Sequence, residues 1–394
     1  MTGTENDMRP GFFLAVALAA AVACNDSSPT ESDRSVATVT IAPVDGTVWT
    51  GTTRQLVATA RAADGTALPG RPITWAGDNE GVAVIDASGR LEARTAGSIL
   101  VAASSEGKRA ELRVTVSEAE LAYEGYPTGL PELFVLSLRG GEPTRVLPPY
   151  TLVTDPTLSP DGSKIAFVVA DYESATGDIF VVNRDGTGLT QLTFDSEMDD
   201  QPAWSPDGTK IAFRSFRTQG QGDIWVMNAD GTNPVNLTPD PLPGITDEAR
   251  PAWSPDGTRI AYASTAGGNM DLWIMRADGG DKRRLTETSE YDTEPTWSPD
   301  GTEIAFRRSS DEYGSDLAVI AASGGTVTRF PHTGNEVAPA WSPDGRLIAF
   351  SVHPSGGGSP QIYTMRPDGT EMTLRTSDYR WNGGRNPSWI RRAP

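Results

Sequence analysis

The heptapeptide PAWSPDG at residues 202–208 recurs through the second half of the chain. Identical copies occupy residues 251–257 and 339–345, PTWSPDG occupies residues 295–301, and a looser PTLSPDG occupies residues 156–162. The serines of successive copies are separated by 44 to 49 residues. A period of this length is typical of stacked or radially arranged structural repeats rather than of a catalytic signature.

Each repeat contains the material for four short strands. In SPDG the proline fixes φ, the aspartate can accept hydrogen bonds from nearby amides and the glycine tolerates positive φ, so the tetrapeptide predicts a turn. PAW precedes the turn, and KIAF, RIAY, EIAF or LIAF follows it with the alternation of a strand. After a variable loop come a third strand such as DIWVMN, a DG turn and a short fourth strand such as RRLT. Four antiparallel strands per repeat predict a propeller blade.

The two ends of the repeat region complement each other. ELAYEG at residues 120–125 and ELFVLS at residues 132–137 match the second and third strands of a blade whose first strand is missing. NPSWI at residues 386–390 matches that missing strand. We therefore predict a six-bladed β-propeller over residues 120–391, closed by the C-terminal strand. Closure in this way leaves no open edge in the ring.

The WSPDG…IAF…DIWVMNADG…LT pattern resembles the TolB-type propeller, and the resemblance covers about residues 121–390. It implies a WD-like fold that acts as a protein- or peptide-binding scaffold in the bacterial cell envelope. The chain departs from TolB in the neighbouring domain, because TolB carries a small α/β domain and is not a lipoprotein.

Residues 36–117 alternate apolar and polar side chains between turn residues. Segments such as QLVATA at residues 55–60, ILVAA at residues 99–103 and LRVTV at residues 112–116 predict about seven short strands in an antiparallel sandwich, with Trp75 as its central aromatic residue. The order of GTTRQLVATA, GRPITW and ASGRLEARTAG is similar to bacterial Ig-like domains of group 2. That resemblance implies a spacer, with ligand binding as the alternative.

The N-terminus is predicted to direct export. The apolar run at residues 11–23 is too short to span a membrane and has the length of the hydrophobic region of a signal peptide. Cys24 follows at once and is the only cysteine, so disulfides within the chain are excluded. AVAC resembles the lipobox of bacterial lipoproteins, which implies a signal peptide over residues 1–23 and lipidation of Cys24. The alternative is an ordinary secretory signal with an incidental cysteine.

Residues 24–35 are polar and predict a flexible tether between the lipid and the fold. An acyl anchor would hold the protein on a membrane surface, periplasmic or outer, without spanning the bilayer. Two start sites remain open, Met1 and Met8, and MRPGFFL after Met8 has the more basic beginning.

Composition sets the outer limits of function. The 394 residues, 37% hydrophobic and 22% charged, are typical of a globular protein of two or three domains. The scattered 41 glycines and 30 prolines favour many turns between strands, hence an all-β protein. The net charge of −19 argues against a nucleic-acid partner, because that affinity depends on Lys and Arg neutralising phosphates.

Catalysis is not predicted. His332 and His353 are the only histidines, both in predicted exposed loops, and the chain has no GxSxG nucleophile motif. A propeller enzyme with a metal would need clustered histidines. We therefore predict a binding protein whose partner is an envelope protein or peptide, without a cofactor. Glycan binding is the alternative, and an enzyme is the more distant one.

The variable loops between second and third strands share one face of the predicted disk, where a rigid scaffold would present binding residues. Three residues before the repeated proline, an acid recurs in four blades, and equivalent positions in a ring would place these acids at the axial mouth. Such a mouth would attract Ca²⁺ or a basic segment. The alternative is that each acid accepts hydrogen bonds within its own loop. The four residues are Asp199, Glu248, Asp292 and Glu336.

Overall fold

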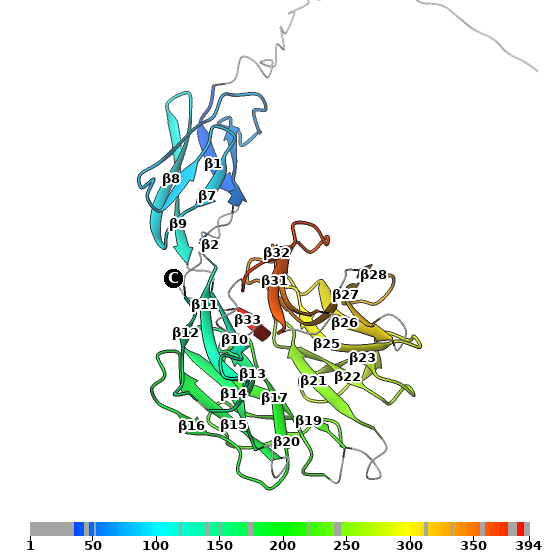
Figure 1. Ribbon diagram of the computed structural model, residues 1–394. Coiled ribbons are helices and arrows are strands. Elements are labelled where there is room, and N and C mark those ends of the chain that lie inside the picture. The colour runs from blue at the N-terminus through cyan, green and yellow to red at the C-terminus, as the bar shows by residue number, and fades with distance from the viewer. Residues whose placement is uncertain are drawn as a thin grey trace, which may run out of the picture.

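The computed structural model describes residues 35–42, 47–50, 53–117, 120–138, 142–149, 151–171, 176–218, 221–239, 246–310, 314–331, 334–354, 359–376 and 384–389. Strands β1 to β33 account for the regular structure of this part of the chain, which contains no helix (Figure 1). No helix in these residues is therefore long and apolar enough to cross a membrane. The predicted signal peptide, Cys24 and nearly all of the tether lie outside the described residues.

Strands β1 to β9 form a separate N-terminal domain in three sheets. One sheet pairs β1 (Thr38–Ala42) with β4 (Val57–Arg61), and another orders β3 (Thr53–Gln55), β7 (Arg90–Ala93) and β6 (Ala83–Ile85). The third orders β2 (Thr47–Trp49), β9 (Lys108–Ser117), β8 (Gly97–Ser105) and β5 (Thr74–Gly77). All of these pairs are antiparallel except β2 with β9, which is parallel.

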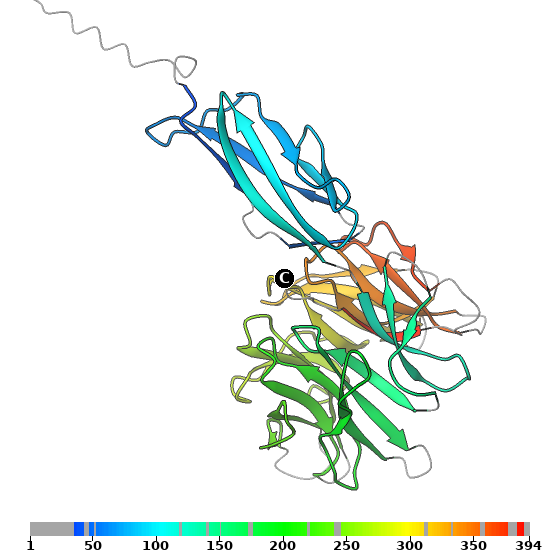
Figure 2. The same cartoon turned by 90° about the vertical axis from the view of Figure 1, so that its left-hand side faces the viewer.

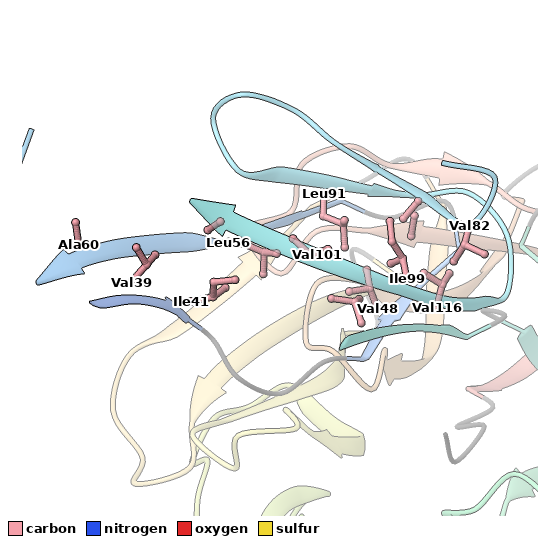
Figure 3. Packing of buried hydrophobic residues seen from close by; sticks show 14 of the residues in the cluster. Val39, Ile41, Val48, Leu56, Ala60, Val82, Leu91, Ile99, Val101 and Val116 are labelled. Atoms are coloured by element: carbon pink, nitrogen blue, oxygen red, sulfur yellow. The ribbon is translucent and has the colours of Figure 1, made fainter. Parts of the chain in front are cut away.

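Alternate side chains of these strands form one apolar core. Val39 and Ile41 of β1 are buried while their neighbours in the strand are exposed, which is the period of two that the sequence predicts. Figure 3 shows these residues with Leu91, Ile99 and other buried side chains between the sheets. Trp75 packs at the margin of this core and is only half-buried, so its predicted central position is wrong.

Six four-stranded sheets, blades 1 to 6, follow the N-terminal domain. Blade 1 orders β33 (Gly384–Trp389), β10 (Glu120–Gly125), β11 (Glu132–Ser137) and β12 (Thr144–Arg145). Blade 2 orders β13 (Val153–Leu158), β14 (Lys164–Asp171), β15 (Thr176–Asn183) and β16 (Thr190–Gln191). Blade 3 orders β17 (Asp199–Trp204), β18 (Lys210–Ser215), β19 (Asp223–Asn228) and β20 (Val235–Asn236). Blade 4 orders β21 (Glu248–Trp253), β22 (Arg259–Ser264), β23 (Asp271–Arg276) and β24 (Arg283–Arg284). Blade 5 orders β25 (Tyr291–Trp297), β26 (Glu303–Ser310), β27 (Gly314–Ala321) and β28 (Val327–Phe330). Blade 6 orders β29 (Asn335–Trp341), β30 (Ile348–His353), β31 (Gln361–Met365) and β32 (Thr373–Leu374).

The last strand of the chain lies in the first blade. β33 pairs antiparallel with β10, with Leu121 opposite Trp389. It also contacts both neighbouring blades, because Ser388 Oγ accepts the Leu158 amide of blade 2 at 3.2 Å and Trp389 Nε1 donates to the Ala340 carbonyl of blade 6 at 2.8 Å.

The repeated SPDG turns form one hydrogen-bonded unit in each of blades 2 to 6. In blade 3, Ser205 Oγ donates to Asp207 at 2.6 Å and accepts the Lys210 amide at 2.9 Å, while Asp207 also accepts the Thr209 amide at 3.0 Å. Gly208 has a φ of 70°, which favours glycine. Serine, aspartate and glycine are therefore each required by the turn itself.

Contacts between blades explain the rest of the heptapeptide. A Cβ built on Gly208 would lie 3.7 Å from the ring of Pro160 in the preceding turn, so successive SPDG turns pack on one another. Two of the four repeated tryptophans also bond to the preceding blade, because Trp253 Nε1 donates to the Ala203 carbonyl at 3.2 Å and Trp297 Nε1 donates to the Ala252 carbonyl at 3.1 Å. The repeat thus encodes architecture, as the sequence indicates.

The N-terminal domain adjoins the propeller face that carries the SPDG turns, here called the turn face (Figures 1 and 2). Glu120 begins β10 at this end and forms an ion pair with Arg184, which lies in the DG turn of blade 2. Burial lowers the pKa of Arg346 in the SPDG turn of blade 6, Asp344 opposes this effect, and the charge of Arg54 in β3 lowers the pKa further. The opposite face, which carries the loops between second and third strands, is here called the loop face.

Candidate binding site at the axial mouth

Each innermost strand of the propeller carries a β-bulge beside its repeated proline. The register shifts between Asp200 and Ala203 in β17 and between Ala249 and Ala252 in β21. A bulge re-aims a side chain, and positive φ is uncommon for residues other than glycine. The residue directly before the proline has positive φ in all six blades, at Asp155 (50°), Gln201 (54°), Arg250 (55°), Glu294 (57°), Ala338 (53°) and Asn386 (49°).

These six residues line an axial channel of about 220 Å³, together with the prolines and small residues that follow them. The bulges thus place residues with positive φ around the axis, where the inner strands of all six blades come together. Non-glycine residues held at positive φ cluster at functional sites, so the channel and its opening are the first candidates for a site.

A hydrogen-bonded network connects blades 1, 2 and 4 across this channel. Arg250 Nη1 lies 2.5 Å from Asp155 Oδ1, and Asn386 Nδ2 donates to the same oxygen at 3.2 Å. Asn386 also donates to Glu124 Oε1 at 2.5 Å, and that oxygen accepts the Asp155 amide at 2.7 Å. Tyr126 donates its hydroxyl proton to Glu124 Oε2 at 2.9 Å.

The charges of the network depend on one another. Burial, followed by the charge of Asp155, raises the pKa of Glu124, and its hydrogen bonds oppose that rise. Burial acts to lower the pKa of Arg250, but the nearby carboxylates of Asp155, Glu294 and Asp200 outweigh it and hold the guanidinium in its charged form. The network therefore fixes the positively charged side chain of Arg250 at the channel entrance.

The channel opens on the loop face into a cavity of about 690 Å³, here called the mouth cavity. Its wall is polar, with contributions from blades 1, 2, 4, 5 and 6. Besides the network, the lining includes Arg307, Ser309, Ser315, Asn335, His353 and Arg385. A cavity of this size and polarity could hold a short peptide segment or a small polar ligand.

Three basic groups lie together on the side of the mouth cavity formed by blades 5, 6 and 1. Arg385 Nη2 lies 3.3 Å from His353 Nδ1, and its guanidinium carbon lies 5.7 Å from the centre of the Tyr126 ring. Burial, then the charges of Arg385 and Arg307, lower the pKa of His353. His353 ends strand β30 and is half-buried, so its prediction as an exposed loop residue was wrong, and His332 lies outside the described residues.

The four acids predicted for the axial mouth lie elsewhere. All four carboxyl-bearing residues are buried, and none lines the channel or the mouth cavity. The prediction failed because it took the side chain three positions before the proline as axial, whereas the bulge turns the residue directly before the proline towards the axis. The four are Asp199, Glu248, Asp292 and Glu336.

Three of these acids have partners within the fold. Asp199 lies 2.6 Å from Arg217 Nη2, Glu248 accepts a hydrogen bond from Ser264 at 2.7 Å, and Asp292 binds Arg308 through two hydrogen bonds of 2.7 Å. Burial raises the pKa of Asp199 to about 6, although Ser215 and Arg217 oppose the rise. These three acids therefore have partners within their own blades, two of them on the neighbouring strand.

Glu336 differs from the other three. It is fully buried, and neither carboxylate oxygen has a hydrogen-bond partner among the described residues. Burial, followed by the charge of Asp316 on blade 5, raises the pKa of Glu336 to about 8. Glu336 and Asp316 thus place two acids in the contact between blades 5 and 6. Asp292, the equivalent of Glu336 in blade 5, is instead paired with Arg308.

Within the described ranges, no group of three or more His, Cys, Asp or Glu side chains is arranged to hold a metal ion. The predicted Ca²⁺ site at the four acids stays a prediction, because the described residues contain no such cluster of ligands. Cys24, the predicted lipidation site, lies outside them.

Comparison with known families agrees with this geometry. The PD40 family model, described as the TolB beta propeller domain, matches residues 112–240 and 242–331, more than half of the chain. The chain belongs to the TolB β-propeller domain family. No curated protein sequence matches it.

Solved structures similar to this chain share its fold. TolB from Acinetobacter baumannii is 20% identical, with a TM-score of 0.60 and coverage of 83% of this chain and 84% of that one. A putative TolB from Agrobacterium tumefaciens is also 20% identical, with a TM-score of 0.53 and coverage of 68% and 92%. A chain of the nidogen/laminin complex is 11% identical, with a TM-score of 0.56 and coverage of 70% and 99%. At these identities the likeness establishes the propeller fold alone.

Proposed function

We propose that this protein is an envelope lipoprotein whose propeller binds a protein or peptide in the mouth cavity. The observation that carries the proposal is the mouth cavity itself, a polar hollow of about 690 Å³ held by bulged strands and bordered by loops whose sequences vary from blade to blade. Rigid scaffolds with variable loops are the usual bearers of binding sites. The resemblance to TolB-type propellers implies a partner from the bacterial envelope.

The N-terminal domain acts in this proposal as an Ig-like spacer. It adjoins the turn face, so the loop face and the mouth cavity lie on the other side of the propeller. A lipid on Cys24 would hold the chain at its N-terminal end. The mouth cavity would then face away from the membrane surface and towards a partner.

We further infer that the C-terminal strand closes the ring and that the propeller binds rather than catalyses. β33 supports closure through its pairing with β10 and its hydrogen bonds to blades 2 and 6. The contacts of Glu124 and Asp155 support binding rather than catalysis. Both carboxylates already accept hydrogen bonds from protein donors, so they are not poised as a general acid and base.

A photo-activated cross-linker placed on the rim would test the proposal. Tyr291 is exposed and lines the mouth cavity, whereas Lys282 is exposed beside the DG turn of blade 4 and serves as the matched control. In native envelopes we expect a discrete protein adduct from position 291 and none from position 282. Adducts from position 282 alone, or the same adducts from both positions, would contradict a partner site at the mouth.

A further inference from the structure

Two arginines face the mouth cavity without a carboxylate in hydrogen-bonding distance among the described residues. Arg307 forms a long ion pair with Glu294, whose Oε1 lies 3.8 Å from Nη1. Arg307 Nε is buried and has no hydrogen-bond partner there. Arg385 is exposed, and its described contacts are the neutral ones with His353 Nδ1 and the Tyr126 ring. Several buried acids elsewhere in the propeller, although not Glu336, have a close arginine, as in the pairs of Asp292 with Arg308 and Asp199 with Arg217.

The acids of the mouth cavity do not satisfy these two arginines. Glu124 accepts hydrogen bonds from Asn386, Tyr126 and the Asp155 amide, and Asp155 is held by Arg250. Glu294 Oε2 accepts the Ala338 amide at 2.6 Å. Protein donors therefore already occupy these carboxylates. Arg307 has only the long ion pair with Glu294 at 3.8 Å, and the printed partners of Arg385 within the described residues are His353 and Tyr126.

Neutral donors flank the same region. Asn335 uses its side-chain oxygen to accept the Ser315 amide at 3.1 Å, which orients its amide nitrogen as a remaining donor. Ser315 Oγ is buried without a hydrogen-bond partner among the described residues. Both residues line the mouth cavity beside Arg307 and Arg385. Arginine and amide donors without acceptors form a site for an anion with several acceptor oxygens.

We propose that Arg307 and Arg385 bind a carboxylate of the protein partner on this side of the mouth cavity. This inference rests on the proposed function and specifies the chemistry of the partner. A carboxylate matches the planar fork of a guanidinium, and such pairs are shorter and stronger than neutral hydrogen bonds. The carboxylate belongs either to the C-terminus of the partner or to an acidic side chain.

Charge makes this site selective. With a formal net charge of −19 the protein repels acidic partners at long range. A partner carboxylate will therefore bind only where nearby arginines offset that repulsion. The net charge of the protein does not itself attract such a partner. Salt will weaken the contact with the arginines and also screen the repulsion.

Three pools of fluorescent hexapeptides, mixed with the full-length protein, test the inference by anisotropy. The first pool has free C-terminal carboxylates and no acidic side chains, the second has amidated C-termini and one acidic residue, and the third has neither kind of carboxylate. We expect the first or the second pool to bind at least tenfold more tightly than the third, and the stronger of the two identifies the source of the carboxylate.

Variants locate the site. Arg307→Gln and Arg385→Gln should each weaken the carboxylate pool at least tenfold, with melting temperatures recorded to confirm folding. Arg276→Gln is the matched control, because Arg276 is exposed, lies on the turn face and pairs with Asp278. It should leave binding unchanged.

Equal binding of all three pools, binding of none, or unchanged binding of carboxylates by the Arg307→Gln/Arg385→Gln protein would each overturn the inference. Competition by a sugar acid but by no peptide would assign the site to a glycan instead and overturn it as well. None of these results would abolish a cross-link from position 291. The cross-linking test of the proposed function is therefore independent of the peptide test of this inference.

Discussion

Replacing Glu336 with glutamine should stabilise the propeller increasingly as the pH rises. Glu336 is fully buried beside Asp316, and burial together with that charge raises its pKa from 4.5 to about 8. In the folded protein the carboxyl group stays protonated up to about pH 8, whereas in the unfolded chain it ionises near 4.5. Its contribution to stability is therefore fully present below pH 4.5 and is lost as the pH rises towards 8.

The magnitude follows from one proton. Between these two pKa values the folded state holds about one proton more than the unfolded state at this group, so stability falls by up to about 1.4 kcal/mol per pH unit. Glutamine does not titrate and carries no charge beside Asp316 at any pH. The difference in unfolding free energy between Glu336→Gln and the parent should thus rise by about 1 kcal/mol or more for each unit from pH 5 to pH 8.

Denaturant unfolding of both proteins at pH 5, 6, 7 and 8 measures this difference. Asp292→Asn is the matched control, because Asp292 occupies the same position in blade 5 but binds Arg308 through two hydrogen bonds. The control should lose about 3 kcal/mol of unfolding free energy, because the buried Arg308 loses its closest carboxylate and keeps only Glu290, at 3.6 Å. A difference for Glu336→Gln that is constant or shrinks as the pH rises would refute the reasoning about the blade 5 and 6 contact.

Three further changes probe attachment, closure and the turns. Cys24→Ser should release the protein from membranes into the soluble fraction, and unchanged partitioning would reject lipidation as the anchor. Deleting residues 386–394 should lower the melting temperature far more than a loop truncation, because it removes most of β33 and exposes the edge of β10; an unaltered melting temperature would contradict closure. Ser205→Ala should lower the unfolding free energy by about 2 kcal/mol, since Asp207 and the Lys210 amide both lose a partner, and a loss under half a kcal/mol would show that the turn tolerates the change.

The repeats made the propeller strands predictable from sequence. In each SPDG turn the serine and aspartate make the same local hydrogen bonds and the glycine has positive φ. The spacing of the SPDG turns along the sequence therefore gives the positions of the blades. The fragments at the two ends of the repeat region predicted a split first blade, and β33 pairs with β10 in that blade.

The candidate site was less predictable because it depends on a local exception to strand alternation. A period of two continued through the innermost strand would carry Asp199 and Glu248 to the axis, but the bulge interrupts that period. One signal in the sequence could have shown this. The residue before the repeated proline is Asp, Gln, Arg, Glu, Ala or Asn in the six blades, whereas the proline beside it never changes.

The contacts that arginines make with other blades could not be read from the sequence. Arg250 meets Asp155 across 95 positions of the chain, and Arg385 meets His353 across 32. Such contacts follow from how the blades are arranged around the axis and not from any local pattern.

Hydrogen–deuterium exchange of the full-length protein, alone and with the partner identified by cross-linking, tests the central claim most directly. The account predicts slower exchange at the residues that border the mouth cavity, 124–126, 307–310 and 384–386, with no change at the SPDG turns. Slower exchange confined to the SPDG turns, with the mouth unaffected, would contradict it and would place the partner on the turn face.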